Sequence, residues 1–257
     1  MSIRSQAYRP IELIVVDNHS SDETYDIARR HADIVDTFGP ERSAQRNRGA
    51  QLAHGDYLLF VDSDMTLSPR VVGDCLEAVM ASGKPGVIIP EVSIGQGFWA
   101  HARALERSCY IGDDTIEAAR FFSRAEFEQS GGYDEHLVAM EDWDLSRRIA
   151  RGRRLPRASS NIKHDEGRLT IVSALAKKRY YGAASRAYWR KYGRPAWGDA
   201  NLMFRPAFLR NWRRLLRHPL LTAGFLCMKS LETAAATLGA IEASIHKDAS
   251  EMDTSAR

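Results

Sequence analysis

Two aspartates separated by one serine are the residues of this sequence best suited to bind a metal ion. Asp62 and Asp64 follow the apolar run 57–61, which is typical of a buried strand. With one residue between them, the two carboxylates reach the same side of an extended turn. Hard oxygen ligands suit Mg²⁺ or Mn²⁺, which also take phosphate oxygens from a substrate. A solvated turn would explain the same residues, because aspartate and serine are common in turns.

A third aspartate ends another apolar run. Asp17 closes the run 11–16, and Asn18 follows it. A carboxylate at the end of a strand can accept the N–H of a pyrimidine base. The alternative is that Asp17 or Asn18 caps the helix expected over 20–31.

Acidic residues also begin a helix predicted at 141–152. Glu141 and Asp142 stand at its start, where the helix dipole favours negative charge whatever their function. A catalytic interpretation requires that one of them act as a general base. His164 follows the strand-like run 158–163. A lone histidine is commonly structural, so it becomes a candidate metal ligand only because a metal is expected nearby.

The elements that must position these residues alternate between strands and helices. Apolar strand-like runs and helical patterns succeed each other up to residue 89, which predicts an α/β fold with an open sheet that binds ligands at the carboxyl ends of its strands. We expect strands at 11–16, 34–38, 57–61, 87–89, 119–123 and 158–163, and helices at 20–31, 41–54, from 69, 96–110 and 141–152. From about 168 the chain reads as helical, with breaks at 193–195, Pro206 and Pro219.

Charge is distributed unevenly along the 257 residues. Residues 1–146 hold 13 Lys and Arg against 25 Asp and Glu, whereas 147–218 hold 20 against 3, although the whole chain carries only +3. This asymmetry suggests chemistry in the first segment and an anionic partner for the second. Three widely spaced cysteines form no disulfide framework, which fits a reducing cytoplasm. We see no signal peptide and predict no membrane span.

The segment 205–218 reads as a basic amphipathic helix. Phe208, Trp212, Leu215 and Leu216 recur at near-helical spacing among arginines, a pattern that suits an anionic lipid surface. The alternative is a helix that packs on the rest of the protein with its arginines simply solvated. Binding of nucleic acid is a weaker alternative, because the segment carries no recognition motif.

Five motifs taken together resemble glycosyltransferase family 2, whose members have the GT-A fold. In order, they are IVVDNHSSD at 14–22, RNRGA at 46–50, GDYLLFVDSD at 55–64, GGYDE at 131–135 and EDWDL at 141–145. The resembling stretch runs from about residue 5 to 164. Each string is permissive alone, but five in family order are specific.

The resemblance implies a role for each candidate residue. On the donor side, Asp17 and Asn18 would contact the nucleotide base, and Arg42 or Arg46 would line the nucleotide pocket. Asp62 would face the ribose or the metal. Asp64 would bind Mg²⁺ or Mn²⁺ beside the diphosphate, with His164 as a further metal ligand. Asp142 would be the general base, and Glu141 would help to place donor or acceptor.

These roles describe an inverting, metal-dependent transfer of a sugar from a nucleotide diphosphate donor, with a UDP-sugar the commonest expectation. The acceptor would be a hydroxyl of a glycan or a lipid-linked molecule in cell-envelope polysaccharide synthesis. The protein would work in the cytoplasm, peripherally on the inner face of the cytoplasmic membrane. The alternatives are a non-catalytic relative that only binds a nucleotide sugar, and a nucleotidyltransferase with a related sheet.

Three segments are expected. Residues 1–167 would form the GT-A-like domain with an open, mostly parallel sheet and helices on both faces. Residues 168–247 would form a helical, basic extension, and 248–257 a disordered tail. Relatives usually begin with a further strand and helix before the segment that resembles 5–10. Either the gene model starts late or the chain is a truncated relative, and the second case would remove part of the base pocket.

Overall fold

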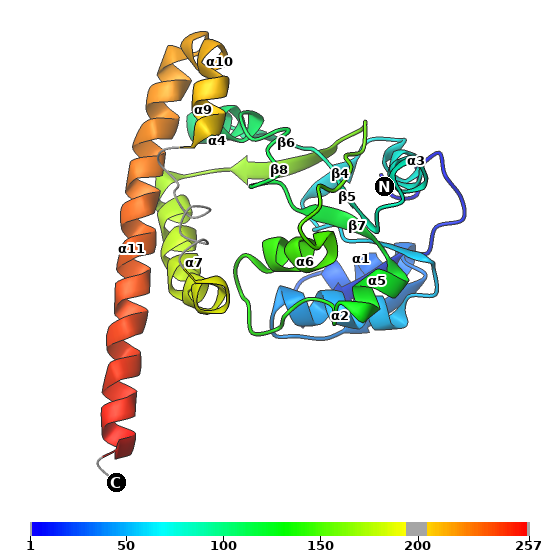
Figure 1. Ribbon diagram of the computed structural model, residues 1–257, viewed down its shortest axis with the longest axis horizontal. Coiled ribbons are helices and arrows are strands. Elements are labelled where there is room, and N and C mark those ends of the chain that lie inside the picture. The colour runs from blue at the N-terminus through cyan, green and yellow to red at the C-terminus, as the bar shows by residue number, and fades with distance from the viewer. Residues whose placement is uncertain (1, 194–204, 256–257) are drawn as a thin grey trace. The chain divides into compact units, whose positions relative to one another are not determined.

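A computed structural model describes residues 2–193 and 205–255, with side chains described to residue 245 (Figure 1). Strands and helices alternate from the N-terminus, and the expected α/β class is confirmed. The first elements are β1 (Ile14–Asp17), α1 (Thr24–His31), β2 (Ile34–Thr37), α2 (Arg42–Leu52), β3 (Tyr57–Leu59), β4 (Met65–Leu67), α3 (Val71–Ser82) and β5 (Gly86–Ile88). Then follow β6 (Glu91–Gln96), α4 (Phe98–Ser108), β7 (Ala119–Ser123), α5 (Arg124–Gln129), α6 (Glu141–Ala150) and β8 (Ile162–Arg168).

The chain forms two compact units. One comprises Met1–Val92 and Ile111–Asp165, and the other Ser93–Tyr110 and Glu166–Arg257. The domain boundary expected at residue 167 stays a prediction, since the compact units divide the chain at 92, 110 and 165. All the candidate site residues lie in the first unit.

The strand pairings correct one part of the sequence-based expectation. Instead of one open, mostly parallel sheet, the described strands form a parallel pair β1-β2 and two three-stranded sheets, β3-β7-β5 and β4-β8-β6. Strand β7 runs antiparallel to both β3 and β5, and β8 runs antiparallel to β4. The strand–helix alternation does give β3 and β5 a common direction. The later strand β7 lies between them, and its residues 119–122 are all buried.

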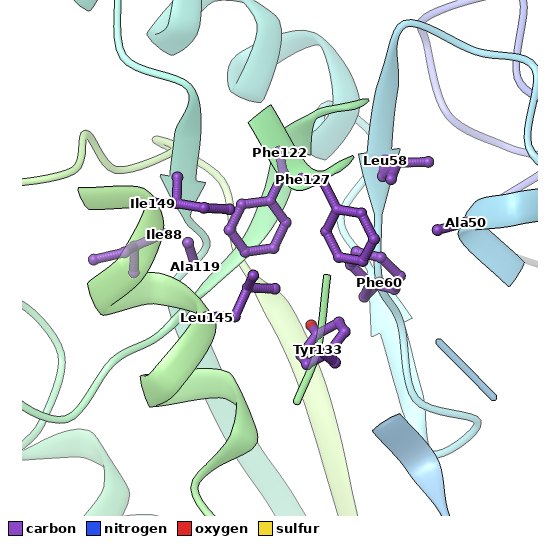
Figure 2. Close-up of a cluster of buried hydrophobic side chains, with 10 residues drawn as sticks. All are labelled: Ala50, Leu58, Phe60, Ile88, Ala119, Phe122, Phe127, Tyr133, Leu145 and Ile149. Carbon is purple, nitrogen blue, oxygen red and sulfur yellow. The ribbon is translucent and has the colours of Figure 1, made fainter. Parts of the chain in front are cut away.

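The core beside β7 is largely aromatic. Phe60, Phe122 and Phe127 pack with ring centroids 5.2–6.4 Å apart, and the Tyr133 ring meets Phe60 edge-on at 5.1 Å. Figure 2 shows Leu145 of α6 beside these rings. Because Leu145 is fully buried, the start of α6 is held at a fixed place over the core.

Polar contacts hold the loop before α6. Asn47 of α2 donates to the Tyr133 carbonyl at 2.9 Å and accepts from the Tyr133 N–H at 2.8 Å. Gly132 has a φ of 68°, and a Cβ there would lie 2.7 Å from the Asn47 amide oxygen. Arg148 of α6 donates to the carbonyls of Ser130 and Gly132 at 2.6 and 2.7 Å. Helices α2 and α6 are thereby tied to the same loop.

The second unit contains the helices of the C-terminal region. They are α7 (Ile171–Tyr192), α9 (Pro206–Arg210), α10 (Trp212–Leu216) and α11 (Pro219–Ser255), and α4 joins them from earlier in the chain. Thr170 and Ser173 form a capping box at the start of α7. The expected breaks at Pro206 and Pro219 are the first residues of α9 and α11, as a proline at the first helical position allows. Of the break expected at 193–195, Gly193 ends α7, and residues 194 and 195 lie outside the described residues.

Helix α11 extends into the segment 248–257, and the disordered tail expected there stays a prediction. The helix continues to Ser255, since the segment after 245 contains neither glycine nor proline to end it. Residues 256 and 257 lie outside the described part of the chain. Among the described residues, no helix combines the length and apolar character that a membrane span requires.

Charged residues of α11 are buried against its neighbours in the second unit. Lys229 and Glu232 are buried, where they pair with Glu106 and Arg103 of α4. Arg103 also bonds Glu106 at 3.0 Å. Buried charges are tolerated only when they are paired in this way. These residues therefore attach α11 to α4.

Candidate functional site

The guanidinium of Arg46 is the centre of the candidate site. Its Nη1 lies 2.9 Å from an Asp142 carboxylate oxygen and 3.1 Å from a Glu141 oxygen, and its Nη2 lies 2.7 Å from Asp62. Arg46 stacks 5.1 Å above the Tyr133 ring, and its side chain is only 9% exposed. Three carboxylates from two separate elements thus converge on one buried cation.

The positions of these residues on α2, after β3 and at the start of α6 explain this convergence. Arg46 lies one turn after Arg42 on α2, so both side chains share a helix face. Arg42 reaches Glu141 at 3.3 Å. Asp62 follows β3, and Glu141 begins α6 directly after Met140, whose positive φ of 63° turns the chain into the helix.

Asp62 is held by a second arginine that the sequence analysis missed. Arg120 of β7 lies 3.3 Å from the other Asp62 oxygen and 2.5 Å from Glu91. Burial alone would raise the pKa of Asp62, but Arg120 and Arg46 outweigh it and lower that pKa. A charged residue inside the otherwise buried, apolar run 119–122 is the signal that could have revealed Arg120.

Asp64 and His164 meet through strand register. Met65 of β4 pairs with His164 of β8, which brings His164 Nε2 to 3.1 Å from the Asp64 carboxylate. His164 Nδ1 lies 3.7 Å from Glu91, the carboxylate that also binds Arg120. A chain of polar contacts therefore runs from Asp64 through His164, Glu91 and Arg120 to Asp62.

Asp17 and Asn18 make local contacts at the end of β1. Asp17 is buried and accepts from the Ser20 N–H at 2.8 Å and the Ser20 hydroxyl at 2.5 Å. Asn18 donates to the Pro40 carbonyl at 2.8 Å. The Asp17 contacts fix the turn at Ser20, but neither Asp17 nor Asn18 caps α1, whose N-cap is Glu23, so the capping interpretation is wrong. No hydrogen bond or ion pair among those described links either residue to the Arg46 group.

Glu141 and Asp142 sit in different environments. The Glu141 side chain is 4% exposed, whereas that of Asp142 is 24% exposed. Burial and the Asp142 charge raise the pKa of Glu141 despite its two arginine neighbours. Of the two carboxylates, Asp142 is therefore the one that a substrate can reach.

The donor set fits a divalent metal only in part. Within the described residues, no group of three or more His, Cys, Asp or Glu side chains is arranged to hold a metal ion. Asp64 and His164 nevertheless form an adjacent oxygen and nitrogen pair, and the Asp64 side chain is 50% exposed. Such a pair fits Mg²⁺ or Mn²⁺ where substrate phosphates and water complete the coordination, which is how Mg²⁺ is usually bound. Both oxygens of Asp62 already bond arginines.

Comparison with known proteins gives a consistent result. A family model described as glycosyl transferase family 2 matches residues 1–136. The chain is 35% identical over 68 residues, 24% of its length and 27% of the relative's, to the Escherichia coli UDP-Glc:alpha-D-GlcNAc-diphosphoundecaprenol beta-1,3-glucosyltransferase WfaP. It is 28% identical over 155 residues, 56% of its length and 60% of the relative's, to a PGL/p-HBAD biosynthesis glycosyltransferase of Mycobacterium tuberculosis (strain ATCC 25177 / H37Ra). It thus spans about a quarter to three fifths of the length of these curated relatives.

One solved structure resembles nearly the whole chain. It is the crystal structure of S. aureus TarS 1-349 in complex with UDP, with a TM-score of 0.50, 16% identity, and coverage of 91% of this chain and 85% of that one. Identity at this level shows a shared fold. The GT-A-like class expected from the sequence is confirmed by this likeness.

Replacement of Arg46 tests its central role. Arg46→Met is expected to lower the free energy of unfolding by about 3–5 kcal/mol at pH 7.5, because it leaves Asp62 and Glu141 charged and poorly solvated. The loss should be smaller at pH 5, since without Arg46 burial raises the carboxylate pKa values and protonation then relieves the penalty as pH falls. Urea unfolding at both pH values measures this difference.

The matched control is Arg29→Met on the exposed end of α1, which should leave stability nearly unchanged at both pH values. An equal loss at pH 5 and pH 7.5 in Arg46→Met would contradict the electrostatic explanation.

Proposed function

Because the chain belongs to glycosyl transferase family 2, we propose that it transfers a sugar from a nucleotide diphosphate to an acceptor hydroxyl, with inversion at the anomeric carbon. The observation that carries this proposal is the convergence of Asp62, Glu141 and Asp142 on Arg46. A strand end and a helix start, far apart in sequence, supply acidic groups to one place in the first unit. That arrangement suits a reaction that needs both donor binding and proton abstraction.

A UDP-sugar is the proposed donor. WfaP is named for a UDP-Glc donor, and TarS is solved with UDP. Asp17 and Asn18 would contact the base, Arg42 and Arg46 would line the nucleotide pocket, and Asp62 would face the ribose. Asp17 already accepts two hydrogen bonds from Ser20, so its carboxylate is oriented before a base arrives.

Asp142 is the proposed general base. The acceptor hydroxyl is a weak nucleophile until a carboxylate takes its proton, which is worth about 10²–10⁴ in rate. As the acceptor oxygen bonds to the anomeric carbon, the bond to the diphosphate breaks, and the proton passes to Asp142. Attack from the face opposite the leaving group inverts the anomeric centre. Glu141, more deeply buried than Asp142 and contacting Arg42 and Arg46, would position the donor or the acceptor.

Asp64 and His164 are the proposed protein ligands of Mg²⁺ or Mn²⁺, with Asp62 the third candidate. When bound, a divalent ion supplies compensation for the charge that develops on the leaving diphosphate. The partial exposure of Asp64 leaves its carboxylate accessible to an incoming diphosphate–metal pair.

The proposed acceptor is a glycan or lipid-linked hydroxyl of cell-envelope polysaccharide synthesis, reached peripherally on the inner face of the cytoplasmic membrane. WfaP is named for a diphosphoundecaprenol-linked acceptor. On this chain, Leu209, Trp212 and Leu216 of α9 and α10 are 52–78% exposed beside several arginines. Exposed apolar side chains next to cations favour an anionic lipid surface.

Asp142→Asn tests the assignment of the base. The substitution removes the proton acceptor but keeps the size of the side chain, so transfer from a labelled UDP-sugar should fall by at least about 100-fold while UDP binding persists. Asp56→Asn, at an exposed position of the first unit, is the control and should keep full activity. Near-full turnover by Asp142→Asn would refute Asp142 as the base, and a wild-type protein that binds UDP-sugars without transfer would favour the non-catalytic alternative.

Asp64→Asn tests the metal site. In the wild type, Mn²⁺ should increase the thermal stabilisation produced by UDP, because metal and diphosphate bind the folded state together. In Asp64→Asn and in His164→Ala this Mn²⁺-dependent increase should disappear. Glu77→Gln, a carboxylate that is 70% exposed on α3, should retain it. If the Asp64 variant keeps the full increase, the metal lies elsewhere.

Charge reversal in α10 and at its C-cap residue tests membrane contact. Arg213→Glu with Arg217→Glu should lower binding to phosphatidylserine vesicles by at least about tenfold, since each basic residue near an anionic surface contributes about 1 kcal/mol. Vesicle flotation at low and high salt measures the effect. Arg29→Glu with Arg30→Glu on α1 gives the same charge change and should leave flotation unaltered. Equal flotation of both double variants would remove α10 from the contact.

A further inference from the structure

An exposed apolar seam runs along α11. Starting at Cys227, exposed residues follow at intervals of four, three, four, three and four. This alternation places all of them on one stripe of a helix, as the first and fourth positions of a heptad. The seam consists of Cys227, Leu231, Ala234, Leu238, Ile241 and Ile245.

The large members of the seam are strongly exposed for apolar side chains. Leu231, Leu238, Ile241 and Ile245 are 42, 57, 49 and 61% exposed. The stripe is about 27 Å long at 1.5 Å per residue. Isolated exposed leucines are ordinary on a protein surface, but a continuous row at heptad spacing is typical of a helix that packs against a partner helix.

The opposite face of α11 is already occupied. Within the second unit it packs against α7 and α4, and Figure 1 shows α7 along one side of it. Gly239 lies so close to α7 that a Cβ there would be 2.0 Å from the Arg179 carbonyl oxygen. Glu242 also pairs with Arg179 at 2.5 Å. The seam is therefore presented by a helix whose other face is held in place, which lowers the entropic cost of binding.

Charge distinguishes a protein partner from a lipid surface here. The only Lys or Arg between 219 and 245 is Lys229, which is buried and paired with Glu106. The residues beside the seam on its solvent side are Ser230, Thr237 and Ser244. A helix that binds an anionic membrane needs basic residues along its apolar face. On the other side the seam is bordered by Glu242, whose charge is paired with Arg179. An uncharged border on one side and a paired charge on the other allow two identical surfaces to approach without strong repulsion.

We propose that this seam of α11 is the surface through which two copies of the chain associate. A heptad stripe is self-complementary, so the same surface serves both copies about a two-fold axis. From the exposed fractions, the seam and its borders offer on the order of 600 Å² per copy, or about 1,200 Å² for two copies, against the roughly 1,000 Å² total that a specific interface requires.

The test is the mass of the full-length protein in solution, measured by light scattering and by sedimentation equilibrium up to about 50 µM, where a micromolar dimer is largely associated. The wild type should be a dimer. Leu238→Glu with Ile241→Glu should raise the dissociation constant at least about 100-fold, because dimerisation would bury four carboxylates without partners. Leu226→Glu, 46% exposed on α11 but off the seam, is the matched control and should remain dimeric.

A second variant guards against misfolding. Leu238→Gln with Ile241→Gln introduces no charge and should also weaken the dimer, while circular dichroism and the thermal midpoint stay near those of Leu226→Glu. A monomeric wild type, or seam variants that remain dimeric, would overturn the inference. So would a monomeric wild type whose vesicle flotation is lost in the seam variants, since the seam would then be a lipid-binding surface.

Discussion

Pairing of one buried guanidinium with three carboxylates is the interaction on which the candidate site depends. Asp62, Glu141 and Asp142 would repel each other at this distance, and each would pay for its loss of hydration. Arg46 offsets both costs through its planar group, which can bond several oxygens at once. Burial of such an ion group adds little net stability, but removal of one member leaves charges without partners. Arg46 therefore contributes more to the positions of these three carboxylates than to the net stability of the fold.

The surrounding structure serves to keep that guanidinium in place. Asn47, the next residue of α2, is bonded twice to the backbone of Tyr133, and the ring of Tyr133 lies under Arg46. Leu145 packs α6 into the aromatic core, so Glu141 and Asp142 at the start of that helix are held in position. Packed neighbours thus set the positions of Arg46 and of its carboxylate partners.

Much of this could be predicted from sequence, because strand ends and helix starts are visible as patterns. Sequence patterns predicted the strand-like runs before Asp17 and Asp62 and the acidic start of α6. The order of the motifs then indicated that Asp62 and Asp142 belong to one site. The strand register was not predictable, although the resemblance already implied that Asp64 and His164 share a site. The three-residue strand β4 is too short for its pattern to be seen, yet its pairing with β8 brings His164 to Asp64. Arg120 was missed because the segment of β7 was assigned only as a strand, and the charge within its otherwise apolar run was not considered. The antiparallel pairing of β7 with β3 and β5 also contradicts the expectation of a mostly parallel sheet.

The balance of charge around Asp62 has a consequence for recognition. Arg42, Arg46 and Arg120 face Asp62, Glu91, Glu141 and Asp142, which is three cations against four carboxylates. Such a nearly neutral group projects only a weak field into solvent, so it offers a free polyanion little long-range guidance. Capture of a ligand at this place then has to rely on short-range fit with the group itself.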